Sequence, residues 1–211
     1  VGKTGSGKST IGLLLNRVMD PTEGRITVDG VDIRDWDVTT LRRAIGTVPQ
    51  DAFLFSDSIA ENIAFGTLDA TRDTVEAYAE FAHVAEDVRG FPKGFDTVVG
   101  ERGVTLSGGQ KQRVSIARAL IKEPPMLILD DALSAVDTDT EVSILSGLKS
   151  KLQGMTALLI TQRLSCVHLA DRIYVLDEGA LVQEGKHTDL LRQQGIYAEL
   201  YLLQNPDTQI A

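Results

Sequence analysis

The sequence predicts an α/β fold with a mainly parallel sheet, an antiparallel β portion and an inserted helical lobe. Two short apolar runs, Met126–Leu129 and Ala157–Ile160, are typical of buried parallel strands, and a stretch of helical character separates them. Residues 51–122 differ from their surroundings, because they contain helical patterns such as residues 74–88 and few β-branched runs. We therefore expect a helical lobe within an α/β core.

The first 40 residues contain one predicted helix and one predicted hairpin. Apolar residues at helical spacing predict a helix over Thr10–Met19, which ends before Pro21 because the residue ahead of a proline disfavours helical geometry. Apolar residues alternate over Arg25–Ile33 on both sides of Asp29 and Gly30, a dipeptide that favours a tight turn. This pattern predicts the antiparallel part of the fold.

The last 40 residues predict two further strands, at residues 172–176 and 181–183, and a helical tail from Leu190 onward. A chain of 211 residues with 43% hydrophobic residues can bury a substantial core. We expect one domain over residues 1–211, with the helical lobe at about 51–122 inserted in it.

Composition excludes several classes of function. The formal net charge of −9 argues against a nucleic-acid partner, because such partners require clustered Lys and Arg. The longest apolar runs are far shorter than the roughly 20 residues that span a bilayer. The single cysteine, Cys166, cannot form an internal disulfide, and the chain does not start with a secretory apolar segment. We expect a soluble piece in a cytosolic setting.

Glycines and a lysine at the start of the chain match a phosphate-binding loop. Gly2, Gly7, Lys8 and Ser9 fit the pattern G-x-x-x-x-G-K-[ST], in which backbone N–H groups surround phosphates, the lysine neutralises them and the hydroxyl binds Mg²⁺. Such a loop follows a strand, so we expect the chain to be truncated at its N-terminus. The predicted phosphate-binding residues are Gly2, Lys3, Thr4, Gly5, Ser6, Gly7, Lys8, Ser9 and Thr10.

An acidic residue ends the apolar run at 126–129. Asp130 follows it directly, and a carboxylate in that place reaches the C-terminal edge of a parallel sheet, where Mg²⁺ binds beside phosphates. Many strands end in Asp, so this residue indicates a Mg²⁺ site only in combination with the phosphate-binding loop.

Residues 106–113, Leu-Ser-Gly-Gly-Gln-Lys-Gln-Arg, resemble the signature LSGGQ-x-Q-R of the ABC ATPases. The resemblance implies a P-loop ATPase core that binds ATP and Mg²⁺ between two nucleotide-binding domains. Ser107 and the bare amides at a helix start form a second anion-binding surface, which in this family faces the γ-phosphate held by the other domain. The signature residues are Leu106, Ser107, Gly108, Gly109 and Gln110.

The resemblance extends over essentially the whole chain. Gln50 corresponds to the Q-loop glutamine, which approaches Mg²⁺ and the γ-phosphate, so the implied metal ligands are Ser9, Gln50 and Asp130. Ser134 and Asp137 correspond to the D-loop, which crosses the dimer interface. Residues 53–63 and 99–103 are similar to segments typical of exporters. The resemblance implies transmembrane domains upstream in the same polypeptide, and a position at the cytoplasmic face of a membrane.

Two residues depart from the family pattern. Asp131 stands where active members have a glutamate that orients or deprotonates water, and its side chain is about 1.5 Å shorter. Gln162 stands where they have a histidine, and an amide cannot become cationic or move a proton. General-base assistance contributes about 10²–10⁴ in rate. With Gln50, Asp131 and Gln162 as its catalytic residues, this site is expected to be slow.

Two functional classes stay open. In the first, the chain is one half of a heterodimeric exporter, and its intact signature serves a competent site on a different subunit. In the second, it is a nucleotide-dependent clamp or regulator that binds ATP and dimerises with little hydrolysis. His83 in the helical lobe, His168 six residues beyond Gln162 and His187 in a polar turn are interpreted as structural. Cys166 is interpreted as a packing residue, because no histidine pairs with it locally.

Overall fold

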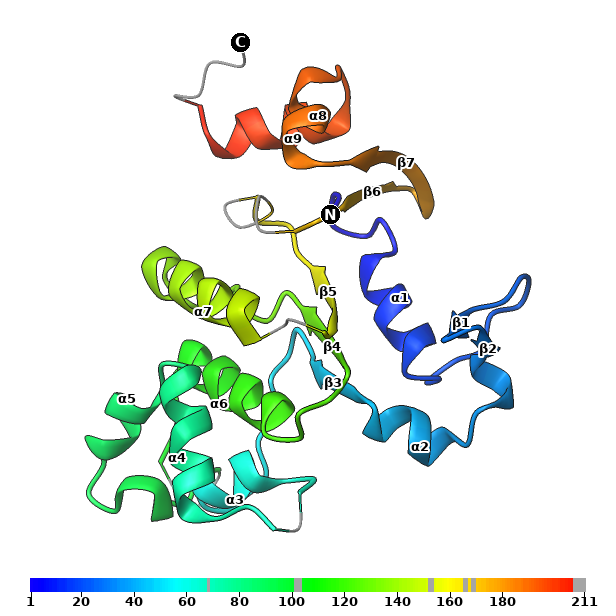
Figure 1. Cartoon of the computed structure of the whole chain (residues 1–211). Helices are drawn as coiled ribbons and strands as arrows, with labels where there is room; N and C mark the ends of the chain where they lie inside the picture. The colour runs from blue at the N-terminus through cyan, green and yellow to red at the C-terminus, as the bar shows by residue number, and fades with distance from the viewer. Residues whose placement is uncertain (68, 101–103, 152–153, 165–166, 168–169, 207–211) are drawn as a thin grey trace. The chain divides into compact units, whose positions relative to one another are not determined.

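The computed structural model describes residues 1–67, 69–100, 104–151, 154–164, 167 and 170–206 (Figure 1). The chain divides into two compact units. Unit 1 consists of Val1–Leu41 and Ile160–Ala211, and unit 2 is Arg42–Leu159. Among the described residues, no helix has both the length and the apolar character needed to cross a bilayer.

Unit 1 combines short strands with helices from both ends of the chain. Its elements are α1 (Lys8–Leu15), β1 (Thr27–Val28), β2 (Val31–Asp32), η1 (Ile33–Asp35), the start of α2 (Val38–Arg43), β6 (Ile173–Asp177), β7 (Ala180–Gly185), α8 (His187–Arg192) and α9 (Ile196–Gln204). Strands β1 and β2 pair antiparallel, as do β6 and β7. The predicted antiparallel portion is therefore confirmed.

Helix α1 ends four residues earlier than the sequence pattern indicates, so the predicted end at Met19 is wrong. Arg17 has a left-handed backbone with φ 49°. Its N–H donates to Leu14 O at 2.9 Å, and the Val18 N–H donates to Leu13 O at 2.9 Å. These two bonds form a Schellman motif, which closes a helix at a left-handed residue. The apolar periodicity continues past this cap, but the helix does not.

The predicted turn at Asp29 and Gly30 is present. Both residues have positive φ, 51° and 81°, and Val28 and Val31 face each other across the turn. Two left-handed residues in a two-residue loop define a type I′ turn, whose twist matches that of the flanking strands.

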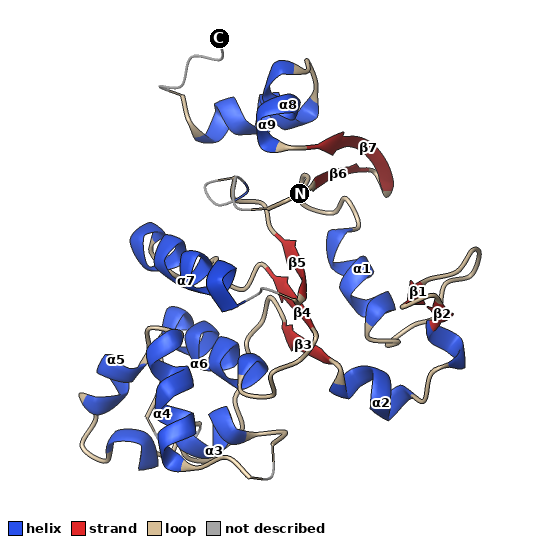
Figure 2. Ribbon diagram, viewed as in Figure 1, coloured by secondary structure: helices blue, strands red, loops and turns tan. Residues whose placement is uncertain are grey.

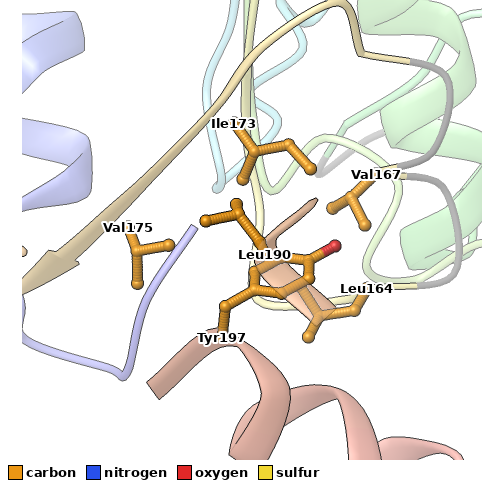
Figure 3. Packing of buried hydrophobic residues seen from close by; sticks show 6 residues of the cluster. All are labelled: Leu164, Val167, Ile173, Val175, Leu190 and Tyr197. Atoms are coloured by element: carbon orange, nitrogen blue, oxygen red, sulfur yellow. The ribbon is translucent and has the colours of Figure 1, made fainter. Parts of the chain in front are cut away.

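A buried cluster holds the C-terminal part of unit 1 together. It joins the segment after β5 to β6, α8 and α9 through six residues, Leu164, Val167, Ile173, Val175, Leu190 and Tyr197 (Figure 3). Tyr197 is fully buried, and its hydroxyl lies 2.7 Å from His187 Nδ1. Burial raises the pKa of Tyr197 above its ordinary value. Tyr197 therefore anchors the first turn of α9 to the buried cluster that includes β6 and to His187 of α8.

Unit 2 contains a three-stranded sheet and most of the helices, shown in blue in Figure 2. Its elements after α2 are β3 (Ile45–Val48), α3 (Ile59–Ala64), α4 (Arg72–Phe81), α5 (Ala85–Arg89), η2 (Gly94–Asp96), α6 (Gly108–Leu120), β4 (Met126–Asp130), α7 (Thr138–Lys151) and β5 (Thr156–Ile160). The helical character predicted for residues 51–122 is confirmed, although the pattern at 74–88 divides into two helices at His83, where φ is 53°.

The sheet has the order β3-β4-β5, and β3 runs parallel to β4 with Val48 opposite Leu129. The sequence analysis missed β3, a four-residue strand that includes Gly46. A Cβ at Gly46 would lie 2.8 Å from the carbonyl oxygen of Ala119, so α6 packs on this strand at backbone distance. Strand β4 forms the centre of the unit, with Leu127 and Ile128 fully buried.

Candidate functional site

The predicted phosphate loop closes around the side chain of Lys8. Its Nζ donates to Gly2 O at 2.8 Å, to Lys3 O at 2.7 Å and to Ser6 Oγ at 3.4 Å. Lys8 is only 8% exposed, although it stands at the first position of α1. A buried ammonium surrounded by oxygens is a concentrated positive charge, and an anion that approaches the loop would replace these internal acceptors.

Two glycines give the loop its shape. Gly2 has φ 150°, and a Cβ there would lie 2.1 Å from Leu176 O, so no side chain fits between the loop and β6. Gly7 has φ 89° and caps the N-terminus of α1. Backbone N–H groups at this helix start have no intrahelical acceptor, and the helix dipole is positive there. The loop is therefore suited to hold phosphate oxygens.

Thr4 and Gln162 connect the phosphate loop to the segment that follows β5. Thr4 Oγ1 donates to Gln162 Oε1 at 2.9 Å. On its other side, the backbone of this segment is bonded to α9: Gln204 Nε2 donates to Gln162 O at 2.7 Å, and the Leu164 N–H donates to Gln204 Oε1 at 2.9 Å. The structure thus brings Gln162 to the loop, as the sequence interpretation requires.

Gln50, Asp130 and Asp131 share one edge of the sheet in unit 2. Gln50 lies two residues beyond Val48 and Asp131 two residues beyond Leu129, and these two strand residues are paired in parallel register. Gln50 is exposed, whereas Asp130 and Asp131 are half-buried. Asp131 has a left-handed backbone with φ 48°, and its carbonyl accepts the Ser134 N–H at 3.0 Å. The chain thus turns sharply at the residue that replaces the usual glutamate.

The signature begins a 13-residue helix with a capping box. Ser107 Oγ accepts the Gln110 N–H at 3.2 Å, and Gln110 Oε1 accepts the Ser107 N–H at 3.0 Å. This contact uses the Ser107 hydroxyl as an acceptor and is compatible with its O–H donating to an anion. The first-turn amides of Gly108 and Gly109 lie at the positive end of α6.

The D-loop packs against the signature glycines within unit 2. A Cβ on Gly109 would lie 2.8 Å from Ala135 O, and one on Gly108 would lie 3.3 Å from Ala135 Cβ. Buried Gln112 joins the two segments, because its Nε2 donates to Ser134 Oγ at 2.9 Å and its Oε1 accepts the Ala135 N–H at 2.9 Å. The sequence analysis quoted Gln112 only as part of a pattern and missed this role.

Asp137 ends the D-loop and starts α7. Its carboxylate accepts the Thr140 N–H at 2.9 Å, and hydrogen bonds from the backbone and side chain of Thr140 hold the pKa of Asp137 below its ordinary value. Such a cap fixes where the helix begins. Asp137 therefore has a local structural task in addition to the interface role that the resemblance implies.

Asp87 of α5 is a second residue that sequence reasoning missed. Its Oδ1 accepts Gln110 Nε2 at 3.0 Å, and its Oδ2 lies 2.9 Å from Arg113 NH1. Arg113 also donates to the carbonyl oxygen of His83, whose imidazole Nε2 lies 3.2 Å from Ser143 Oγ. No local sequence signal joins residue 87 to the signature, because the contact depends on how α5 packs beside α6.

The predicted site residues are thus divided between the units. Residues 2–10 and Gln162 lie in unit 1, and Gln50, Asp130, Asp131, the signature and the D-loop lie in unit 2. In the described ranges, no three His, Cys, Asp or Glu side chains gather around a possible metal ion. His83 and His187 have the structural contacts given above, whereas His168, Cys166 and residues 101–103 lie outside the described residues.

Comparison with known proteins places these features in a family. The family model described as ABC transporter matches residues 1–134. The chain is 51% identical over 204 residues to an ATM1-type heavy metal exporter of Novosphingobium aromaticivorans. The matched region covers 97% of this chain and 34% of the exporter. The chain is also 48% identical over 205 residues to an ATP-dependent lipid A-core flippase of Vibrio cholerae, and this match covers 97% of the chain and 35% of the flippase.

A solved structure of a bacterial Atm1-family ABC exporter with ATP bound is similar in fold, with a TM-score of 0.93 and 50% sequence identity. The matched region covers 97% of this chain and 36% of the exporter chain. The fold predicted from the sequence is thus found in a solved relative. The chain spans about a third of the length of the relatives that it matches.

Proposed function

Because this chain belongs to the ABC transporter family, we propose that it is an ATP-binding domain that pairs with a second nucleotide-binding domain and drives an exporter. The observation that carries the proposal is the phosphate loop, in which buried Lys8 donates to the backbone oxygens of Gly2 and Lys3. The relatives named above include an exporter and an ATP-dependent flippase, and a relative structure holds ATP.

The loop is preorganised for the phosphates of ATP. The Lys8 ammonium is already desolvated and points back over residues 2–6, so phosphate oxygens can take the place of the carbonyl acceptors without moving the helix. Gly7 adds no side chain at the start of α1, where backbone N–H groups have no intrahelical acceptor, whereas buried Gly2 lets the loop pack closely on β6. Together these groups provide the charge and the donors that a triphosphate requires.

The proposed metal ligands fit Mg²⁺ by their chemistry. Ser9 offers a hydroxyl, Asp130 a carboxylate and Gln50 an amide oxygen, and Mg²⁺ prefers such hard oxygen ligands. Mg²⁺ usually takes only one or two protein carboxylates and completes its shell with phosphates and water, so a group of three acidic or His side chains is not needed. When bound, the ion would neutralise charge on the phosphates.

The signature is proposed to act on ATP that a different subunit holds. Ser107, Gly108 and Gly109 form a rigid first turn, because the capping box fixes the helix start and Ala135 packs directly against both glycines. A rigid donor surface loses little entropy when it meets a phosphate. The intact and well-supported signature favours a role beside a competent partner site over a clamp with little hydrolysis.

The chain's own site is proposed to hydrolyse ATP slowly. The side-chain oxygen of Gln162 accepts from Thr4, which leaves its NH₂ group to donate toward a phosphate but provides no proton acceptor. Asp131 has a shorter side chain than the usual glutamate, and its backbone is left-handed. Gln162 cannot transfer a proton, and the Asp131 carboxylate, although it is a base, ends this shorter side chain, so the pair should assist proton transfer less than a Glu and His pair. The partner is therefore proposed to be a different subunit that carries the competent pair.

The remaining parts of the exporter are proposed from the lengths and names of the relatives. They are about three times as long as this chain, which leaves room for transmembrane domains that we place upstream in the same polypeptide. We place this chain itself at the cytoplasmic face of the membrane. Their names differ in cargo, one a heavy metal and the other a lipid. We therefore assign no cargo.

Calorimetry with Mg-ATP tests the binding proposal. Lys8→Ala removes the buried ammonium and should weaken Mg-ATP binding by at least about tenfold, because charge-assisted bonds to phosphate contribute about 1.5–3 kcal/mol. Lys186→Ala, which removes an exposed lysine of unit 1 outside the loop, is the matched control and should leave binding unchanged. Equal affinity for wild type and Lys8→Ala would overturn the assignment of the loop.

A further inference from the structure

Gln204, in the last turn of α9, makes a paired contact with the backbone of the Gln162 segment. Its side-chain NH₂ donates to Gln162 O at 2.7 Å, while its side-chain oxygen accepts the Leu164 N–H at 2.9 Å. One amide thus satisfies a carbonyl and an N–H that lie two residues apart, as a neighbouring strand would. The contact joins residues 40 and 42 positions apart in the sequence.

The segment that Gln204 holds is the one that meets the phosphate loop. Gln162 presents its side chain to Thr4, and its own carbonyl is the atom that Gln204 binds. A continuous series of hydrogen bonds therefore runs from α9 through Gln162 to residue 4. All of these residues belong to unit 1.

The Leu164 end of the segment and the start of α9 are each fixed by further contacts. Leu164 is 2% exposed and lies in the buried cluster of Figure 3, beside Tyr197 of α9. Helix α9 is in turn fixed at its start, because the Tyr197 N–H donates to Gln183 Oε1 at 2.9 Å. The backbone of Gln162 lies between this cluster and the phosphate loop. By binding the Gln162 carbonyl, Gln204 restrains the position of this backbone and so the direction of the Gln162 side chain.

We propose that Gln204 is a positioning residue, which holds the Gln162 backbone so that its side-chain amide faces the phosphate loop and distinguishes ATP from ADP. This inference rests on the proposed ATP-binding function. A side chain bonded to Thr4 stands beside the loop that holds the phosphates, and its NH₂ group can donate to the terminal one. Gln204 acts only through this geometry and does not touch the nucleotide itself.

The test compares the affinities of the full chain for ATP and ADP by calorimetry. Gln204→Met keeps a similar volume but removes both hydrogen bonds, and it should weaken ATP binding about three- to tenfold while ADP affinity changes less than about twofold. Asn205→Ala is the matched control, because the Asn205 side chain donates only to Tyr201 O within α9 among the described contacts. It should leave both affinities unchanged.

A second variant background separates positioning from a role in folding alone. In a Gln162→Ala chain, Gln204→Met should have no further effect on ATP affinity, because the side chain that it positions is gone. Equal losses for ATP and ADP, an undiminished effect in the Gln162→Ala background or an unchanged ATP affinity would each overturn the proposal. If Gln204→Met does not fold, Gln204→Glu replaces it, since it keeps the acceptor for Leu164 and removes the donor to Gln162.

The controls also distinguish this inference from the function on which it rests. A chain whose ATP affinity is insensitive to Lys8→Ala refutes the phosphate-loop assignment, and the positioning role falls with it. If Lys8→Ala weakens ATP binding but Gln204→Met leaves the ATP affinity unchanged, the positioning role alone is refuted.

Discussion

Thr4 Oγ1 donates a 2.9 Å hydrogen bond to the side-chain oxygen of Gln162, across 158 positions of the sequence. The bond joins the phosphate loop to the residue that replaces the histidine typical of active ABC ATPases. Its consequence is that this glutamine is oriented by the loop itself, with its NH₂ group left to donate. The positioning role that we propose for Gln204 depends on this orientation, and the bond can be measured separately from catalysis.

A double-mutant cycle of Thr4→Val and Gln162→Leu measures the bond through the free energy of unfolding. Both substitutions remove polar atoms at similar size. We expect a coupling of about 0.5–1 kcal/mol, near the low end for a hydrogen bond because the contact is exposed. Denaturant titration of the four chains gives the value. Additive effects, within about 0.3 kcal/mol, would contradict the contact.

Gly109→Ala tests the packing of the D-loop on the signature. The added Cβ would meet the backbone oxygen of Ala135 at 2.8 Å, so either the helix start or the D-loop must shift. We expect a loss of about 1–3 kcal/mol in the free energy of unfolding, as for other overpacked contacts. Gly147→Ala in α7 is the control, because its Cβ would meet only two ring atoms of Phe81, at 3.4 and 3.6 Å, which is ordinary van der Waals contact.

For Gly147→Ala we expect no loss, and thermal unfolding of the two variants provides the comparison. Alanine is the better helix former, so the control can even gain about 0.5–1 kcal/mol. Similar stability of both variants would mean that the signature glycines tolerate a side chain, and that their smallness serves something other than the D-loop contact.

The chain by itself is expected to show little or no ATP hydrolysis. Each site in the proposed assembly needs a signature from the other domain, and the chain's own pair is Asp131 and Gln162. Phosphate release by the purified chain, at a concentration too low for pairing, measures the residual rate. Turnover that resists Lys8→Ala comes from a contaminant, whereas strong turnover that is lost in Lys8→Ala would contradict both the shared site and the slow pair.

Sequence reasoning succeeded where a local pattern carries the geometry. The turn at Asp29 and Gly30 needs two left-handed residues, and that dipeptide supplies them. Strand β4 is a short apolar run, and the structure buries its centre completely. The capped start of α6 follows from Ser107 and Gln110 at capping-box spacing, although the sequence analysis used Ser107 for anion binding alone.

It failed where tertiary contacts decide the outcome. The end of α1 depends on Arg17 taking a left-handed backbone that its residue type does not favour. Strand β3 gains its place from the close approach of α6 at Gly46. The contacts of Asp87, Gln112 and Gln204 join segments between 19 and 42 positions apart, and no spacing rule covers such distances.

Steady-state ATP hydrolysis by the heterodimer that we propose tests the central claim most directly. Gly108→Asp places a carboxylate at the signature, against a phosphate held by the partner, and should remove more than about nine-tenths of the activity. Gly108→Ala adds the same Cβ without charge, 3.3 Å from Ala135 Cβ, and separates the steric part. Asp131→Glu combined with Gln162→His restores both lost roles and should raise turnover at this chain's site.

The decisive variant is Asp131→Asn, assayed beside Gly108→Asp in that heterodimer. If this chain's site is already slow and its signature serves the partner's site, Asp131→Asn should lower the total hydrolysis rate by less than about threefold, while Gly108→Asp abolishes most of it. If Asp131→Asn silences the complex as fully as Gly108→Asp, this chain's own site is a main catalytic one, and the account is wrong.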